Sequence, residues 1–518
     1  MALGPNSLAA AVGSGIQNTP FAATATVIPR QILILATYDP LKTTVVNETP
    51  VQVFSAEDAG DKFGFGFMAH RLAVQAFEGS SGIPTFIQPQ SEAVGAVAAS
   101  GKITFTAAIT VAGTMYLYIA GISVPVVIPQ GIDGAAVAIL VAAAITANSN
   151  LPITAVVNGV TLNQVDITAK SKGPWGNEIT LRFNINGEKP LADLGITAAV
   201  IVDMASGAGI PTVADALNGL GTGDNANEAF FTDVVHGYGL DTTTLNAISA
   251  YVGSGDTFTG LYSKTVSRPF RVLTGDTVAD TAGLTALIAI TNNRLLDRAN
   301  GVISVPGSAS HPAEIAAQAI GHMARLNNIR AEQNYLGVSL NGIDPGATAD
   351  RWTSDYDNRD TAVKKGISPT RVRSGAVYLQ NVVTFYRPAS IPVNSNAYRS
   401  MRNISIYQNI LDNIRTNFES SKWQGISIVA DVARVASTVD KQKARDIDSV
   451  VGDLIQLAGE FYSKGWIYTD SVTIDALTVA IRTGTDGFEM TFPIIPSGEG
   501  NIFDVTTLVD TSVAILNS

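Results

Sequence analysis

Two blocks of alternating strand and helix signals, separated by a stretch of mostly strand signals, constrain this fold more than any other feature. The first block has a buried-strand run within Val27–Thr37, a second run at Thr49–Phe54, a helical stretch at Ser55–Glu78 and a third strand run at Ile83–Gln90. Ser55, three residues before Asp58, resembles the start of a capping box. This order is typical of an α/β domain.

The second block begins after about residue 227, and its apolar runs are the predicted strands AFFTDVVHG, RPFRVLTG, NGVISVPG and YLGVSLNG. Helices are predicted between them at Thr242–Tyr251, Thr281–Ala299 and Pro312–Gln333. The alternation favours a mainly parallel sheet. A polar loop, Asp344–Asp360, is predicted to follow.

The stretch between the blocks differs, because its predicted strands are ITFTAAIT, TMYLYIAG, SVPVVIPQ, VTLNQVDITAK and EITLRFNIN, separated by Gly and Asn turns. One Ala-rich helix is predicted near Gly134–Asn148. We interpret this stretch as an inserted β-rich domain. After residue 360, a strand or hairpin AVYLQNVVTFYRP precedes helices at Tyr398–Phe418 and Asp446–Lys464, and the strands DALTVAIRTG and FEMTFPIIP.

The chain ends in NIFDVTTLVDTSVAIL, Asn501–Leu516, which alternates with a period of two as a half-buried strand does. The apolar positions predicted to contact another copy are Phe503, Val505, Val509, Val513 and Ile515. A long strand with an unpaired edge favours aggregation unless another strand covers it, so donation to a neighbouring copy is one use for this segment. An ordinary edge strand of the subunit's own sheet is equally compatible with the pattern. Residues 1–20 have little apolar pattern and suggest an arm that is ordered only by a partner, or not at all.

The predicted fold class is therefore a multidomain α/β protein, with an α/β core interrupted by a β-rich insert, an α+β C-terminal domain and extended terminal arms. The predicted boundaries are 1–22 for the N-terminal arm, 23–93 and 190–360 for the core, 94–189 for the insert, 361–500 for the C-terminal domain and 501–518 for the C-terminal strand arm.

Composition narrows the function. Only 15% of residues are charged, against about 25% in average soluble proteins, which suits a subunit largely covered by copies of itself. A low-charge, β-rich globular protein remains the alternative.

The chain has no cysteine, so it has no disulfide framework or thiolate metal site, and nothing in its cysteine content argues against synthesis in the cytoplasm. The longest apolar run, Gly134–Ala147, is too short to cross a bilayer, and the absence of Lys and Arg before Arg30 argues against a signal peptide.

One region is basic on an acidic chain of net charge −11, because Lys364–Arg445 holds thirteen Lys or Arg against four Asp or Glu. The residues predicted to form a cationic face are Arg399, Arg402, Arg415, Lys422, Arg434, Lys441, Lys443 and Arg445. These cations are scattered and carry no groove-reading motif, so an acidic protein partner is favoured over nucleic acid. A solvated surface is the other interpretation.

Motifs for catalysis and cofactors are weak. The histidines are His70, His236, His311 and His322, none in a metal-ligand spacing, so helix-end or surface positions are expected for them. Neither a GxSxG elbow nor a phosphate-binding Walker motif occurs, and the lone GxG at Gly64–Gly66 lacks the rest of a dinucleotide fingerprint. The Asp-rich loop at 344–360 lacks EF-hand spacing, so calcium is disfavoured. We assign no catalytic, cofactor-binding or metal residue.

Several long stretches together resemble the tail sheath proteins of contractile bacteriophages, of the Mu-like type. They are RQILILATYDP, TPVQVFSAEDAGDKFGFGFMAHRLAVQAF, SGKITFTAAITVAGTMYLYIAG, KGPWGNEITLRFNI, KKGISPTRVRSGAVYLQNVVTFYRP and YRSMRNISIYQNILDNIRTNF, with the closing helix and strand. They span nearly the whole chain in the family's order. The GISPTRVRSG turn and the Asp-rich loop depart from the pattern.

The resemblance implies a non-enzymatic structural subunit of the virion tail, assembled in the host cytoplasm. Copies would stack as hexameric rings in a helical sleeve around a tail tube, with terminal arms adding strands to neighbours. Contraction would drive the tube through the host cell envelope for genome ejection. The implied partners are other copies, the tail tube protein, and baseplate and tail terminator proteins, with neither nucleic acid nor membrane insertion. We further expect the insert on the outside of the sleeve and the basic region facing the tube.

Two alternatives remain. The first is the sheath of a phage-tail-like bacteriocin or secretion machine, which the sequence does not separate from a phage sheath. The second is a subtilisin-like hydrolase, which would need a Ser-His-Asp set built on one of the four histidines.

Overall fold

The computed structural model describes residues 25–255, 257–388, 397–484 and 487–501, and these form two compact units. Of these residues, one unit holds 27–412 with 496–501, and the other holds 25–26 with 413–495. The predicted N-terminal arm and the predicted inter-subunit strand, Phe503 to Ile515, lie outside the described residues. Their proposed roles therefore stay predictions.

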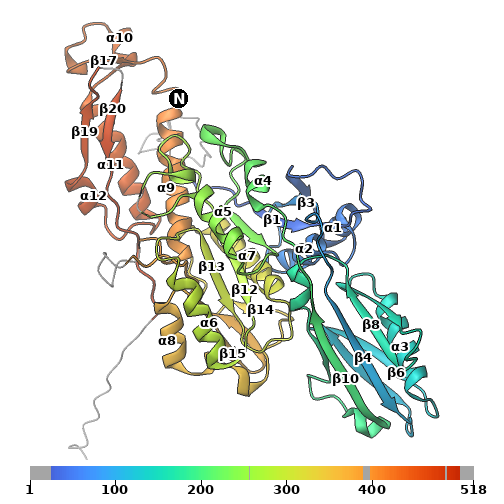
Figure 1. The fold of residues 1–518 in the computed structure, drawn as a ribbon. Coiled ribbons are helices and arrows are strands. Elements are labelled where there is room, and N and C mark those ends of the chain that lie inside the picture. The colour runs from blue at the N-terminus through green and yellow to red at the C-terminus, as the bar shows by residue number, and fades with distance from the viewer. Residues whose placement is uncertain (1–24, 256, 389–396, 485–486, 502–518) are drawn as a thin grey trace, which may run out of the picture. The chain divides into compact units, whose positions relative to one another are not determined.

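A nine-stranded mixed sheet is the centre of the larger unit, in the order β14-β16-β15-β13-β12-β11-β1-β3-β2 (Figure 1). Its strands are β1 Ile32–Thr37, β2 Val51–Val53, β3 Thr85–Gln90, β11 Asp233–His236, β12 Arg271–Asp276, β13 Asn300–Ser304, β14 Ser339–Leu340, β15 Ser368–Arg373 and β16 Ala376–Leu379. The neighbours from β15 through β3 pair in parallel, as predicted, and β2, β14 and β16 pair antiparallel. Every residue of β1 is buried, which explains its unbroken apolar run ILILAT.

Helices cover this sheet, and α2 packs against both α7 and the strands β1 and β3. The helices of this part are α1 Ala56–Phe63, α2 Met68–Gly79, α4 Val213–Asn218, α5 Thr242–Val252, α6 Asp280–Asn292, α7 Pro312–Ile329 and α8 Tyr356–Lys364. The backbones of α2 and α7 approach closely at two glycines: a Cβ on Gly79 would lie 2.3 Å from the Gln318 carbonyl oxygen, and one on Gly321 2.5 Å from the Ala76 carbonyl oxygen. Larger residues would push the helices apart.

Some of the sequence predictions for this unit need correction. The helix predicted at 55–78 is two helices, because Gly64 and Gly66 adopt φ of 96° and 81°, which end α1 and redirect the chain. Its predicted start is confirmed, since Ser55 Oγ accepts from the Asp58 amide. The helix predicted from Thr281 ends at Asn292 rather than at residue 299. The loop predicted at 344–360 includes the start of α8, whose first turn is capped by Asp355.

Within the stretch between the two α/β blocks, residues 100–205 form two further sheets and one α-helix. The four-stranded sheet has the order β10-β4-β8-β7 and consists of β4 Ser100–Ala107, β7 Ile153–Val157, β8 Gln164–Ala169 and β10 Ile196–Ala205. The three-stranded sheet consists of β5 Gly113–Ile119, β6 Ile122–Ile128 and β9 Leu181–Phe183, and α3 spans Gly134–Ala147. β7 and β10 were not predicted, and β10 lies beyond residue 189, where the insert was predicted to end.

The smaller unit has its own aromatic core. Its elements are α10 Thr438–Lys443, α11 Ile447–Ser463, α12 Ser471–Asp475, β17 Ser427–Ile428, β18 Ala444–Arg445, β19 Thr478–Ile481 and β20 Phe488–Thr491, and α9 Met401–Glu419 ends in it. The Phe461 ring stacks on Trp466 at 5.5 Å between centroids, and Trp466 is 1% exposed. In both units, no described helix has the length and apolarity needed to span a bilayer.

A buried ion pair joins the central strands of the large sheet to the helices beside it. Arg271 and Asp233 are both 0% exposed, and Arg271 Nη2 lies 2.6 Å from Asp233 Oδ1. The guanidinium also donates to Asn327 Oδ1 at 2.9 Å and to the Met401 carbonyl oxygen at 2.9 Å, and it bonds the Tyr335 hydroxyl. Strands β11 and β12, the end of α7 and the start of α9 therefore share one charged group.

We expect Asp233→Asn to destabilise the larger unit by about 3–5 kcal/mol, because it leaves the Arg271 charge buried without its counter-ion. The measurement is urea unfolding followed by circular dichroism. Arg182→Met is the matched control: its ion pair with Asp203 is 51% and 73% exposed, so a change of no more than about 1 kcal/mol is expected. Equal effects from the two variants would contradict a structural role for the buried pair.

Candidate assembly surfaces

The segment that leads into the predicted C-terminal strand is bound to the larger unit by side chains. Arg402, at the start of α9, donates through Nη1 to the Ser497 carbonyl oxygen at 2.6 Å and through Nη2 to Ser497 Oγ at 2.5 Å. Ser400 Oγ donates to Glu499, and Asn334 Nδ2 donates to Asn501. Residues 497–501 are therefore held in place up to the point where the predicted strand begins.

Arg402 was predicted to contribute to a cationic face, but its side chain is buried, with 3% of the residue exposed, so the folded chain does not present this charge at its surface. Its guanidinium is used for the bonds to Ser497 and for one to the Glu332 carbonyl oxygen. Arg399 is half-buried, and its Nη2 donates to the Val363 carbonyl oxygen at 3.0 Å. Periodicity and charge could not distinguish these two internal arginines from surface cations.

The smaller unit contains the other six predicted cations, and the structure brings three of them together. Arg445 donates to the Lys422 carbonyl oxygen at 2.8 Å, and Lys443 Nζ donates to the Gln424 carbonyl oxygen at 3.0 Å. Lys422 pairs with Asp453, and the Arg445 guanidinium lies 5.6 Å from the centroid of the Trp423 ring. These cations therefore help to hold residues 422–445 together.

The remaining three cations differ in their surroundings. Arg434 and Lys441 are exposed, whereas Arg415 Nη1 lies 3.3 Å from Glu419 Oε2. Counted by sequence, residues 413–495 hold eight Lys or Arg and eleven Asp or Glu. Any cationic face on this unit is therefore local, and centred on the exposed side chains of Lys422, Arg434, Lys441 and Lys443.

A two-stranded antiparallel ladder in the smaller unit has open edges. β19 and β20 pair from Thr478 with Thr491 to Ile481 with Phe488, and α11 packs against β19. No other described strand pairs with either one. Most of their residues are exposed, including Ile481 and Met490. A two-stranded ladder is marginally stable alone, so this one is suited to receive further strands.

All four histidines are buried, so the predicted surface positions are wrong, and only His311 caps a helix. Burial lowers their pKa values to about 4, so they are neutral near pH 7. His311 Nδ1 accepts from the Ala313 amide, which assigns the proton to Nε2, 3.1 Å from the Trp175 carbonyl oxygen. Among the described residues, no serine hydroxyl is hydrogen-bonded to a histidine ring.

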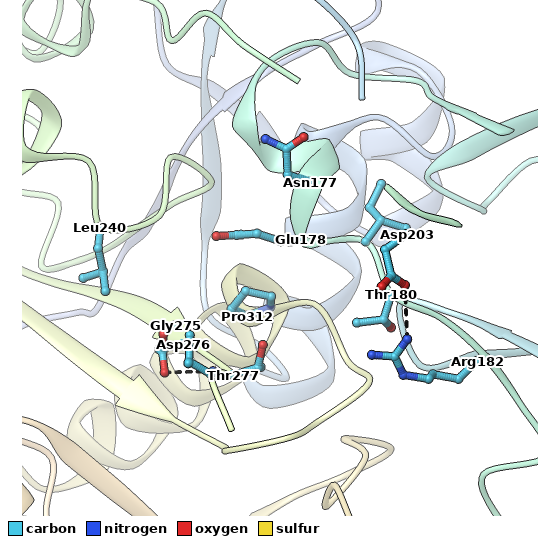
Figure 2. Close-up of a pocket in the computed structure, with 12 residues that line it drawn as sticks. Asn177, Glu178, Thr180, Arg182, Asp203, Leu240, Gly275, Asp276, Thr277 and Pro312 are labelled. Atoms are coloured by element: carbon cyan, nitrogen blue, oxygen red, sulfur yellow. Dashed lines mark hydrogen bonds and ion pairs between the residues drawn. The ribbon is translucent and has the colours of Figure 1, made fainter. Parts of the chain in front are cut away.

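A cavity of about 330 Å³ lies between the 3₁₀ turn Pro174–Glu178 and the end of β12 (Figure 2). Burial raises the pKa of Asp276 to about 6, and burial followed by the charge of Asp276 raises the pKa of Glu178. Figure 2 shows these side chains on different elements, with the Arg182–Asp203 ion pair at another wall. In the described part of the chain, no three His, Asp or Glu side chains are placed to hold a metal ion. We assign no chemistry to this cavity.

Comparison with known proteins shows that this chain is similar to a curated tail sheath protein. The chain is 24% identical over 358 residues to a Mu-like prophage tail sheath protein of Haemophilus influenzae, and the match covers 68% of each protein. The resemblance to the Mu-like tail sheath proteins is confirmed. No protein-family model matches the sequence.

Solved sheath structures are also similar to this chain. A sheath tail protein of Desulfitobacterium hafniense is 13% identical, with a TM-score of 0.44 and coverage of 94% of this chain and 98% of that one. The sheath of an extracellular contractile injection system, in its contracted state, is 7% identical with a TM-score of 0.47, over 98% and 99% of the two chains.

We expect Arg402→Met to release residues 497–501 from the larger unit, because it removes the donors to Ser497 and Glu332 while keeping an apolar side chain of similar length. Amide hydrogen exchange followed by mass spectrometry should show at least about tenfold faster exchange in this segment. Arg387→Met is the control, since its guanidinium bonds the side chains of Thr291 and Asn292 instead. Unchanged exchange in the Arg402 variant would show that other contacts hold the segment.

Proposed function

We propose that this chain is the structural subunit of a contractile tail sheath. Copies stack as hexameric rings in a helical sleeve around a tail tube, and contraction of the sleeve drives the tube through the envelope of a host cell for genome delivery. The observation that carries this proposal is the similarity to a Mu-like tail sheath protein over two thirds of the chain.

Strand exchange between neighbours is the proposed means of assembly. The β19–β20 ladder offers open edges, and the sequence from Phe503 to Ile515 has the alternation of a strand that could add to such an edge. Anchoring of residues 497–501 by Arg402 supports this proposal, because force on the strand would pass directly into the larger unit. Head-to-tail contacts of this kind build open helical assemblies.

Contraction requires two packings of the same folded subunits, with the extended packing held behind a barrier. Strand-exchanged contacts suit this requirement, because a covalently continuous arm keeps neighbours joined while rigid units move. The buried ion pair of Arg271 and Asp233 supports the idea that the larger unit moves as a rigid body. The scarcity of surface charge also suits a subunit covered by other copies.

The proposed contact with the tube uses the exposed cations Lys422, Arg434, Lys441 and Lys443. Each exposed ion pair contributes only about 0.2–1 kcal/mol, so the contact depends on repetition along the tail and is reversible.

The same subunit could serve a phage-tail-like bacteriocin or a secretion machine. A subtilisin-like hydrolase is not supported, because the histidine rings described above bond mainly to backbone groups.

The tube contact is tested by reversing Arg434, Lys441 and Lys443 to Glu. Arg445 is left intact because its guanidinium donates to three backbone carbonyl oxygens, whereas Lys443 donates to one, and thermal melting verifies that the variant folds. We expect this variant to form sheath polymers alone but to lose assembly on the tube, as seen by electron microscopy. Raising salt from about 0.1 to 1 M, where the Debye length falls from about 10 to 3 Å, should loosen the unaltered sheath from its tube in the same way.

The matched control is the reversal of Lys189, Lys264 and Lys365, which are exposed outside residues 413–495 and change the net charge equally. This control should assemble on the tube. Normal tube assembly by the Arg434, Lys441 and Lys443 variant would place the tube contact elsewhere. Loss of tube assembly in both variants would show a net-charge effect and not a local contact.

A further inference from the structure

The four-stranded sheet β10-β4-β8-β7 has one face that no described element covers. Its other face, which includes Ile103, Phe105, Val165 and Ile167, is buried, and α3 packs against β4, β7 and β8 (Figure 1). Because side chains alternate along a strand, the residues between those buried ones point to the opposite face. That face is open to solvent.

The strand register places the residues of the open face in rows. Lys102 on β4 is paired with Val202 on β10 at one side and with Asp166 on β8 at the other. Asp166 is paired in turn with Val156 on β7. One row across all four strands therefore contains Val202, Lys102, Asp166 and Val156. The valines are 45% and 67% exposed, which is unusual for β-branched apolar side chains.

From either end, the side chains of this row follow the order apolar, charged, charged, apolar. The two central charges, on Lys102 and Asp166, have opposite signs. A second copy rotated by two-fold symmetry would set Lys102 against Asp166 twice, and Val202 against Val156 twice. The face is electrically neutral, although each chain carries a net charge of −11 that makes most contacts between copies repulsive. We propose that this sheet face binds the same face of a second copy of the chain, in a two-fold arrangement.

The surrounding residues fit a contact between two sheets. The next row contains Val200, Thr104 and Gln164, so β-branched valine and threonine side chains recur across the face. Asp166 is held by hydrogen bonds from Asn158 Nδ2 at 2.7 Å and Gln164 Nε2 at 2.6 Å, which fixes its carboxylate. No described residue forms an ion pair with Lys102, so its ammonium group is available to a partner.

The dimension of the face predicts a weak contact. Four strands at about 4.8 Å spacing give a width of about 14 Å, and strands of roughly seven residues at about 3.3 Å each give a length of about 23 Å. The face therefore offers roughly 320 Å², well short of the roughly 800 Å² per partner of a stable interface. All subunits of a sleeve around a tube point in the same direction along it, so no two-fold axis relates neighbours within one sleeve. This contact therefore joins free subunits, or copies in separate assemblies. The proposal does not depend on the proposed function, since the contact belongs to the folded chain itself.

Cross-linking of the full-length chain tests this arrangement directly, because the chain has no native cysteine. Chains carrying Val156→Cys are mixed with chains carrying Val202→Cys and treated with a short bifunctional maleimide after polymers are removed by centrifugation. The two-fold arrangement sets residue 156 of one copy against residue 202 of the other, so the mixture should give covalent dimers, and each chain alone should give at least tenfold fewer. Equal yields from either chain alone, or no dimers from the mixture, would overturn the proposal.

Charge exchange gives the second test in the same assay. Lys102→Asp sets like charges against each other and should lower the dimer yield about tenfold, while the swap Lys102→Asp with Asp166→Lys should restore it. Lys102→Asp leaves the bonds to Asp166 intact, so loss of folding is not expected, and thermal melting verifies this. Lys189→Glu, outside the face, should leave the yield unchanged. An unaffected yield in Lys102→Asp, or no recovery in the folded double variant, would overturn the two-fold arrangement.

Discussion

The buried ion pair between Arg271 and Asp233 is the constraint on which the larger unit depends. Desolvating two charges costs several kcal/mol each, and the cost is offset only when every donor finds an acceptor in one geometry. Here those acceptors come from β11, from α7 and from the backbone at the start of α9. Arg30 lies close by, bonded to Gln408, and burial lowers its pKa to about 10. Any shift of the start of α9 against the sheet would therefore break charged hydrogen bonds, so this unit is suited to move as one body.

Much of the α/β arrangement could be predicted from the sequence, because buried parallel strands such as Ile32–Thr37 give continuous apolar runs. The division of the first helical stretch could have been expected from Gly64 and Gly66, since a positive φ favours glycine. β10 escaped prediction because it is half-exposed and rich in alanine, so its alternation is faint, and its pairing with β4 depends on a contact distant in sequence. The internal role of Arg402 could not be predicted either, because burial of an arginine depends on acceptors that only the fold supplies.

The proposed assembly combines few strong internal contacts with many weak external ones. Exposed cations of the smaller unit, the open β19–β20 ladder and the uncovered sheet face are all modest as single contacts. Because every copy in a polymer repeats these contacts, their summed free energy can hold the assembly together. Each contact is weak, so all of them can also be released together. A surface with little charge lets acidic subunits approach one another, whereas the few exposed charges then determine which surfaces meet.

Electron microscopy of the purified full-length chain tests the central claim most directly. A sheath subunit should form tubes or stacked rings with six-fold symmetry, and addition of the tube protein from the same tail should convert them to sleeves with a filled core. A chain that stays monomeric at high concentration, with intact termini and with the tube protein present, would contradict the account.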